Sequence, residues 1–236
     1  MNLEKTAREL DSQNYSFTSS DEWSLVDRYP ENWAALAESW DRLAVDRYMK
    51  NGDTYRRRRF CKYAVDASRA TVVELDDFGF YQSRAINSYA GGQRREFAPV
   101  EPDIRKNRIV REIIQTCLHA ILDGDPNLPK TWNVFVHQIR INCSRSAVGQ
   151  PTPEGLHRDG HDFISMHLID RVGVEGGTSR ICSIDGRPLM TVTLRNRMDG
   201  FLVDDRAVLH GVSQITPTTA DDGHRDMLII DYNRAE

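Results

Sequence analysis

The chain has 236 residues, of which 39% are hydrophobic and 28% charged, and its formal net charge is -4. This length fits a single domain, residues 1–236, with its own hydrophobic core, and the acidic balance argues against a nucleic-acid groove or an anionic membrane surface as partner. The sequence contains no basic start followed by an apolar stretch, no window of roughly 18 apolar residues and no CxxC pair, so we expect a cytoplasmic protein with reduced cysteines and no membrane contact.

The first 130 residues read as a mixed, helix-containing region that supports the rest of the domain. Apolar residues fall at helical spacing between Trp33 and Tyr48, with Pro30 just upstream. A clearer apolar stripe at i, i+3, i+4 and i+7 predicts a helix over residues 104–122. Gly124 follows where such a helix would end. We expect both helices to pack on a sheet formed by later residues.

A run of four arginines, residues 56–59, lies within this region. Such a run is typical either of a nucleic-acid patch or of a charged face, and short runs can also pair with acids inside the protein. Tyr55 and Phe60 flank the run, and the chain as a whole is acidic, which favours internal ion pairs.

From residue 131 onward the hydrophobic period changes from that of helices to that of strands. Residues 132–143 carry β-branched and aromatic side chains in alternation, which predicts a strand. Further strand candidates, separated by turn residues, are 163–169, 179–184, 190–194, 200–204, 208–215 and 227–232. Many short strands at regular spacing indicate a barrel or sandwich. We therefore predict a mainly β fold with flanking α-helices, in which residues 131–236 form a metal-binding double-stranded β-helix core, a cupin-like relative of the jelly roll.

Two His-x-Asp triplets, at residues 157–159 and 224–226, are candidates for metal binding. In extended chain, residues i and i+2 point to the same face, so either triplet can offer one imidazole and one carboxylate to a single ion. A third ligand should come from a distant strand. His157 and Asp159 have such a candidate in His210, inside the apolar segment 208–212, whereas no histidine follows His224. The first triplet is therefore the predicted metal site.

Two histidines and one carboxylate on one face of an octahedron form the facial triad of non-haem Fe(II) oxygenases. The three positions that remain open can accept a bidentate 2-oxo acid and O2. A structural zinc site would normally be closed by four ligands, often cysteines, and no cysteine lies near His157, Asp159 or His210 in the sequence. The pattern thus predicts Fe(II) as the metal, with a 2-oxo acid and O2 as co-substrates.

Arg225, in the middle of the second triplet, is a candidate ligand for the distal carboxylate of 2-oxoglutarate. We expect His210 and Arg225 to lie on the two arms of one hairpin, at a separation that a five-carbon diacid and an extended arginine can span. The planar fork of arginine suits a carboxylate. The alternative is a surface arginine beside Asp226.

Gln138 and Arg140 share one face of the predicted strand 132–143. If this face points inward, Arg140 would pair with the carboxylate of a substrate. The alternative is an ion pair on the outer face of the sheet. We predict Gln138 and Arg140 as candidate substrate-binding residues.

Several stretches resemble the 2-oxoglutarate/Fe(II) oxygenase family that hydroxylates free aliphatic L-amino acids, the isoleucine and leucine dioxygenases. The matching segments are YRRRRF (55–60), VHQIRIN (136–142), PTPEGLHRDGHDF (151–163), EGGTS (175–179), VDDRAVLHGVSQITP (203–217) and HRDMLIIDY (224–232). The resemblance implies a double-stranded β-helix with iron on His157, Asp159 and His210. It also implies that Arg225 holds 2-oxoglutarate, that the substrate is a free amino acid similar to isoleucine, leucine or methionine, and that succinate and CO2 are co-products.

Two other functions stay open from the sequence. A 2-oxoglutarate-dependent peptide or protein hydroxylase would share the fold and the metal, although the short chain leaves little room for a docking domain. A non-catalytic jelly roll that binds a small acid or sugar is the second, and the complete triad with Arg225 argues against it. A kinase is excluded, because neither His-Arg-Asp triplet is followed by an asparagine five residues later and no glycine-rich phosphate loop is present.

Overall fold

The computed structural model of the chain describes residues 1–87, 89–219 and 221–235. Its largest element is an eight-stranded sheet in which β4 (Thr71–Leu75) pairs with β3. Every strand pair in this sheet is antiparallel. The other strands follow one another across the sheet in the order β1 (Tyr15–Thr18), β12 (Gly200–Asp204), β8 (Phe163–Val172), β15 (Gly223–Arg234), β7 (Thr131–Cys143), β3 (Arg56–Asp66) and β2 (Ala44–Val45).

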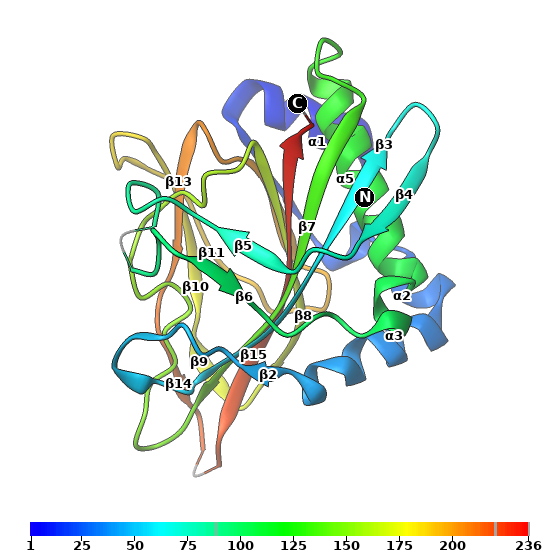
Figure 1. Cartoon of the computed structure of the whole chain (residues 1–236). Helices are drawn as coiled ribbons and strands as arrows, with labels where there is room; N and C mark the ends of the chain where they lie inside the picture. Colours follow the sequence, from blue (N-terminus) through cyan, green and yellow to red (C-terminus); the bar gives the residue numbers. More distant parts are fainter. Residues whose placement is uncertain (88, 220, 236) are drawn as a thin grey trace.

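A smaller group of strands lies on one side of the large sheet (Figure 1). A three-stranded sheet has the order β11 (Pro188–Thr193), β10 (Thr178–Ser183) and β13 (Val208–Val212). Two further pairs join β14 (Ile215–Pro217) to β9 (Val174–Gly176) and β5 (Gly79–Tyr81) to β6 (Arg94–Glu96). Ile181 and Val208 of the three-stranded sheet pack with Ile164 and Phe201 of the large sheet in one buried cluster. The predicted mainly β fold with a double-stranded β-helix core is confirmed.

The helices gather on the other side of the large sheet (Figure 1). They are α1 (Leu3–Gln13), α2 (Leu25–Arg28), α3 (Pro30–Glu38), α4 (Pro102–Arg105) and α5 (Arg108–Gly124), with short 3-10 turns η1 (Ser20–Glu22), η2 (Ser39–Arg42) and η3 (Lys50–Gly52). This arrangement leaves the face toward β10, β11 and β13 available for a cavity.

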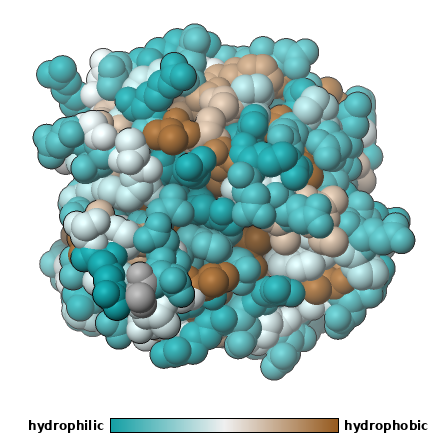
Figure 2. Space-filling view, turned by 90° about the horizontal axis from the view of Figure 1, so that it is seen from below, coloured by the Kyte–Doolittle hydropathy of each residue, from teal (hydrophilic) through white to brown (hydrophobic). Residues whose placement is uncertain are grey.

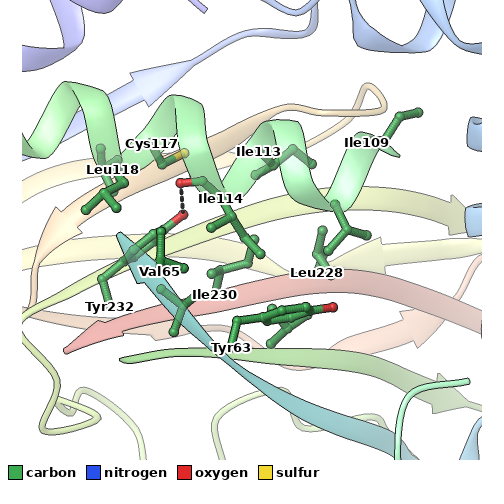
Figure 3. Packing of buried hydrophobic residues seen from close by; sticks show 14 of the residues in the cluster. Tyr63, Val65, Ile109, Ile113, Ile114, Cys117, Leu118, Leu228, Ile230 and Tyr232 are labelled. Carbon is green, nitrogen blue, oxygen red and sulfur yellow. Dashed lines mark hydrogen bonds between the residues drawn. The ribbon is translucent and has the colours of Figure 1, made fainter. Parts of the chain in front are cut away.

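The helix α5 buries an apolar stripe against the large sheet. Asn107 caps its first turn by accepting a hydrogen bond from the backbone N–H of Ile109 at 2.9 Å. Ile113 and Ile114 of the stripe are fully buried in the same core cluster as Leu228 of β15 (Figure 3). Burying a side chain of this size contributes roughly 1.5–3 kcal/mol. The core between α5 and the sheet therefore stabilises the strands that also carry the functional side chains.

The central strand β15 divides its side chains between the two faces of the sheet. Leu228 and Ile230 point toward α5 and belong to the main core. Met227 and Ile229 point the opposite way and line a cavity between the two sheets. Because side chains alternate along a strand, one face builds the core while the other builds the cavity.

The helices differ from their predicted bounds. After α3 ends at Glu38, the chain forms η2 and β2 instead of continuing as a helix to residue 48. The segment 104–122 divides into α4, which ends at Arg105, and α5, which begins at Arg108, because Asn107 caps a new helix between them.

One strand prediction also needs correction, and the mixed region before residue 131 proves to contain strands of the main sheet. The segment 208–215 is two strands, because β13 pairs with β10 whereas β14 pairs with β9. The first 130 residues contribute strands as well as supporting helices, since β3 pairs with β7 and β1 pairs with β12. The four arginines at 56–59 therefore lie on a strand of the main sheet.

The surface shown in Figure 2 is mainly hydrophilic, with hydrophobic residues in small separated groups. The exposed large apolar side chains are likewise scattered over several elements, among them Val73 on β4, Tyr81 on β5 and Ile184 after β10. Within the described ranges, no helix combines the length and the hydrophobicity needed to cross a membrane.

Candidate active site

The three side chains predicted to bind metal lie together at the cavity. One ligand atom from each of His157, Asp159 and His210 lies within 4.8 Å of the others. Nε2 of His157 is 3.6 Å from Oδ1 of Asp159, and Nε2 of His210 is 3.5 Å from Oδ2 of the same carboxylate. The backbones of the two histidines form an antiparallel bridge, with N–H to carbonyl distances of 3.0 and 2.9 Å. The backbone itself therefore holds the two imidazoles side by side.

A buried aspartate, Asp205, fixes the turn that carries Asp159. The Asp205 carboxylate accepts hydrogen bonds from the backbone N–H groups of Asp159 at 3.1 Å, Gly160 at 2.7 Å and His161 at 3.0 Å. Its Oδ1 atom also lies 3.4 Å from Nε2 of His210. One side chain thus connects the loop of Asp159 with the strand of His210.

The same turn requires glycine directly after Asp159. Gly160 has a φ of +86°, in the left-handed region that side chains other than glycine rarely adopt. A Cβ at this position would approach the side chain of Ile86 to 2.9 Å. Glycine therefore lets the chain turn sharply enough for Asp205 to reach three consecutive N–H groups.

The donor set fits Fe(II). Nε2 of His210 is buried and has no hydrogen-bond partner among the described residues. Burial lowers the pKa of His157, but the carboxylates of Asp159 and Glu154 outweigh it and raise this pKa to about 9. A divalent cation can replace a proton among such groups, and two imidazoles with one carboxylate leave three coordination positions open.

Arg225 lines the same cavity from β15 and is 3% exposed. Burial, and then the neighbouring guanidinium of Arg171, lower the pKa of Arg225 to about 10. No hydrogen bond or ion pair joins its side chain to another described residue, and its buried Nε is unsatisfied. A buried cation without a partner is costly, so this position fits an anionic group of a bound molecule.

The expected hairpin between His210 and Arg225 is wrong. The strand β13, which carries His210, pairs with β10, whereas β15 pairs with β7 and β8. His210 and Arg225 therefore reach the cavity from opposite sheets. They line one cavity because the two sheets face each other and not because their strands are neighbours.

Gln138 and Arg140 do not line the cavity, so their predicted contact with a substrate is corrected. Gln138 donates to Oγ of Ser39 at 2.6 Å on the helical side of the sheet. Arg140 forms a two-pronged hydrogen bond to Asp226, at 2.7 Å from each oxygen, and a third bond to Asp41 at 2.8 Å. The even-numbered residues of β7 face the helices. Arg140 therefore forms an ion pair on the outer face of the sheet, which was the alternative to substrate binding.

A second group of arginines lines the cavity from β3 and β6. Arg56 forms the predicted internal ion pair, with Asp46 at 2.7 Å. Arg58 donates from Nη2 to Nδ1 of His137 at 2.6 Å, and burial lowers the pKa of Arg58 to about 9. Arg95 is 2% exposed and its pKa is also lowered by burial. Neither Arg58 nor Arg95 forms an ion pair with any residue that the structure describes.

The loop between β5 and β6 connects Arg95 to Asp159, one of the candidate metal-binding residues. Gln82 accepts a hydrogen bond from Nη2 of Arg95 and another from Nδ2 of Asn87 at 2.9 Å. The same amide donates to the backbone carbonyl of Asp159 at 2.8 Å. The loop therefore forms part of the cavity wall beside the triad.

Some of these residues carried a signal in the sequence. Alternation along 56–59 indicates that Arg56 and Arg58 share a face, once that segment is taken as a strand. Glu154 lies within the PTPEGLHRDG segment, three residues before His157. Arg95 has no such signal, because its role depends on the loop that brings β6 to the cavity.

A family model described as 2OG-Fe dioxygenase matches residues 37–231. The chain belongs to this family. It is therefore a 2-oxoglutarate- and Fe(II)-dependent dioxygenase that uses O2, as the sequence predicted.

Two curated relatives of this dioxygenase span nearly its whole length. L-isoleucine-4-hydroxylase of Bacillus thuringiensis is 20% identical over 239 residues, which cover 99% of this chain and 96% of the relative. The 3(1)-hydroxy-L-isoleucine 4-dioxygenase of Pantoea ananatis (strain AJ13355) is 22% identical over 245 residues, which cover 98% and 96%.

Solved structures share the fold of the dioxygenase. A bsmA homolog from Methylobium petroleophilum PM1 superposes with a TM-score of 0.90 at 24% identity, covering 100% of this chain and 94% of that one. The IDO structure from Bacillus thuringiensis gives a TM-score of 0.84 at 15% identity and covers 100% of both chains. These similarities show the fold.

Proposed function

We propose that this dioxygenase hydroxylates a free L-amino acid with an aliphatic or thioether side chain, similar to isoleucine, leucine or methionine, and forms succinate and CO2 from 2-oxoglutarate. In this proposal His157, Asp159 and His210 hold Fe(II), and Arg225 binds the distal carboxylate of 2-oxoglutarate. The names of both curated relatives refer to isoleucine or a hydroxylated isoleucine, which supports this substrate class.

The observation that carries the substrate class is the lining of the cavity. Apolar side chains from both sheets form much of its wall, namely Ile139, Met166, Leu194, Phe201, Val212, Met227 and Ile229. Such a wall suits an aliphatic or thioether side chain. Buried guanidinium groups without a carboxylate partner line the same cavity, and they suit the carboxylate that every free amino acid carries.

The protein's own contribution to the reaction is to bind and orient. Bound Fe(II) and 2-oxoglutarate supply the oxidising chemistry, and the protein sets which C–H bond or thioether sulfur lies nearest to it. Arg225 would fix the far end of 2-oxoglutarate, while Asp205 and the backbone bridge keep the three metal-binding side chains in place. The apolar wall excludes water from the reacting centre.

We also propose that residues 1–236 act as one oxygenase domain in the cytoplasm. The strands β1 and β3 of the first 130 residues are hydrogen-bonded into the same sheet as β7, β8, β12 and β15, which supports a single folding unit.

The test is a screen of the twenty L-amino acids with Fe(II), 2-oxoglutarate and O2. Mass spectrometry should detect the gain of one oxygen on an aliphatic or thioether amino acid, with succinate formed in equal amount. Short peptides that contain the same residues serve as the matched comparison. Modification of the peptides without any product from the free amino acids would overturn the proposal in favour of a peptide hydroxylase.

A further inference from the structure

We propose that Arg58 and Arg95 bind the α-carboxylate of the amino-acid substrate and that Glu154 binds its ammonium group. This assignment rests on the function proposed above and extends it to the residues that would recognise a zwitterion. The apolar part of the cavity would then receive the side chain of the substrate.

The positive end of this site consists of two buried guanidinium groups. Arg58 is 8% and Arg95 is 2% exposed, and both line the cavity. Their Nε atoms are buried and have no hydrogen-bond partner among the described residues. Arg56 on the same face of β3 differs, because Asp46 already neutralises it at 2.7 Å. Two of the three arginines therefore have donors left for an anion.

The protein fixes the orientation of Arg58 through His137. An arginine side chain can only donate, so Nδ1 of His137 accepts from Arg58 at 2.6 Å, and the imidazole donates from Nε2 to Asp231 at 2.9 Å. Burial, and then Arg58, lower the pKa of His137 to about 4, which agrees with a neutral ring. The ring of Phe97 lies 4.1 Å from the guanidinium carbon. One edge of the fork is thus held while Nε stays unpartnered.

Arg95 comes from β6 and is tied to the loop that carries Asp159. Its Nη2 atom donates to Gln82, and Gln82 donates in turn to the backbone carbonyl of Asp159 at 2.8 Å. The Arg95 guanidinium also lies over the ring of Phe80 at 4.9 Å. A carboxylate held by Arg95 would therefore sit close to the metal-binding residues.

The negative end is assigned by elimination among the carboxylates that line the cavity, which are Glu154, Asp159 and Asp231. Asp159 belongs to the metal-binding group. Asp231 already accepts from His137 at 2.9 Å and lies 3.1 Å from Nε2 of His161. Oε1 of Glu154 lies 3.7 Å from Nε2 of His157, but among these three carboxylates Glu154 alone keeps a buried oxygen, Oε2, without a partner in the described ranges. An ammonium group would supply the missing donor.

The site proposed here is separate from the one proposed for 2-oxoglutarate. Arg58 pairs with Ile139 of β7 on one side, whereas Arg225 pairs with Ile141 of β7 on the other. Their strands are therefore two interstrand spacings apart, or about 10 Å at roughly 4.8 Å each. The two positions can serve two different carboxylates at once.

A zwitterion site also selects against peptides. A residue inside a peptide has neither a free carboxylate nor a free ammonium group, so it would leave the buried guanidinium groups of Arg58 and Arg95 without an anion and Oε2 of Glu154 without a donor. Leaving one buried charge unpaired lowers affinity about 30-fold or more. The three side chains would thereby restrict the enzyme to free amino acids.

The test compares three probes that differ in one charged group each. L-Isoleucine carries both charges, L-isoleucinamide lacks the carboxylate, and (2S,3S)-2-hydroxy-3-methylpentanoate lacks the ammonium group. Calorimetry under nitrogen, with Fe(II) and 2-oxoglutarate bound, gives the dissociation constants. In the unmodified protein we expect the amide and the hydroxy acid to bind about 30-fold or more weakly than isoleucine. Equal affinity for all three would overturn the site.

Variants then assign each charge to its residue. Arg58→Gln and Arg95→Gln should weaken binding of isoleucine and reduce its advantage over the amide, without changing the affinity for 2-oxoglutarate. Glu154→Gln should instead reduce the advantage of isoleucine over the hydroxy acid. Arg57→Gln, on the exposed face of the same strand, and Glu31→Gln, exposed on α3, are the matched controls and should change neither ratio.

The outcomes separate this site from the function on which it rests. If Arg58→Gln does not fold, Arg58→Lys keeps the charge without the fork and should show an intermediate loss. Variants that keep the ratios of the unmodified protein would overturn the site and leave the hydroxylase proposal standing. If the unmodified protein converts 2-oxoglutarate but binds neither isoleucine nor leucine nor methionine, the proposed function fails together with the site.

Discussion

His157 and His210 are joined by a pair of backbone hydrogen bonds, each residue donating its N–H to the carbonyl of the other at 3.0 and 2.9 Å. No other residues continue this bridge into a longer ladder within the ranges that the structure describes. The bridge sets the separation of the two imidazoles, whose ring centroids are 4.6 Å apart. The arrangement of these two candidate ligands is thus built into the backbone as well as into the side chains.

Replacing either histidine should therefore remove metal binding without unfolding the protein. We expect His157→Ala and His210→Ala to lose bound Fe(II) and all turnover, because each removes one of three ligands while the backbone bridge persists. Metal analysis after gel filtration measures the first effect, and circular dichroism checks the fold. His119→Ala, on the exposed side of α5, is the control and should retain iron. Full activity in either ligand variant would contradict the assignment.

Arg225 should determine the requirement for 2-oxoglutarate. Arg225→Gln removes a buried cation from its proposed carboxylate partner, so we expect KM for 2-oxoglutarate to rise about 30-fold or more. KM for the amino acid should change far less. Arg225→Lys keeps the charge but loses the planar guanidinium. Its KM for 2-oxoglutarate should lie between those of the unmodified protein and Arg225→Gln. An unchanged KM for 2-oxoglutarate in Arg225→Gln would reject this role.

Asp205 should act as a positioning residue for the loop of Asp159. Asp205→Asn keeps the shape but removes the negative charge that attracts three backbone N–H groups, and hydrogen bonds to charged groups are worth about 1.5–3 kcal/mol each. We expect a loss of about 2–4 kcal/mol in the free energy of unfolding and roughly 10–100-fold weaker iron binding. Urea denaturation and metal titration measure these effects. Asp185→Asn, at an exposed turn, should have neither effect.

The buried His167 should make the protein less stable in mild acid. Its imidazole packs edge-on with the ring of Trp23, at 5.3 Å between ring centroids. Burial lowers the pKa of His167 from 6.5 to about 3. Below pH 6.5 the unfolded chain binds a proton at His167, whereas the folded chain does not. The free energy of unfolding therefore falls as the pH falls below 6.5, and above pH 6.5 His167 causes no loss. For one such group the loss is about 2 kcal/mol between pH 6.5 and 5.

His167→Gln should remove this part of the pH dependence, because glutamine can still bond to Ser165, which lies 3.1 Å from the imidazole. Urea denaturation at several pH values between 5 and 7.5 would show a shallower slope than in the unmodified protein. His119→Gln, an exposed histidine, should leave the slope unchanged. Identical slopes in all three proteins would refute the link to His167.

The sequence alone predicted most strands after residue 131 and named the three side chains that the structure brings together, because strand alternation is a short-range pattern. The alternation in residues 132–143 matches β7, and the pairing of His157 and Asp159 with a distant histidine follows from the two-residue repeat of a strand.

The sequence did not predict which face of β7 lines the cavity. This strand is buried on both faces, with Val134 and Val136 against the helices and Ile139 and Ile141 against the cavity. Both faces of β7 are therefore apolar, and the alternation does not distinguish the helical face from the cavity face. The prediction that Arg140 faces the cavity was wrong for this reason. Arg58 does point into the cavity, but it lies on β3. The pairing of β3 with β7 is a long-range contact that the local sequence pattern does not reveal.

Alternate side chains of β15 face the main core and the cavity, and this affects which substitutions the protein can accept. Exchange of Met227 or Ile229 would reshape the cavity and the smaller core cluster between the two sheets, while Leu228 and Ile230 would continue to pack in the core beside α5. Single substitutions on this face can thus change the shape of the cavity and leave the core between α5 and the sheet intact. Changes of the cavity wall and changes of the main core can therefore arise separately along one strand.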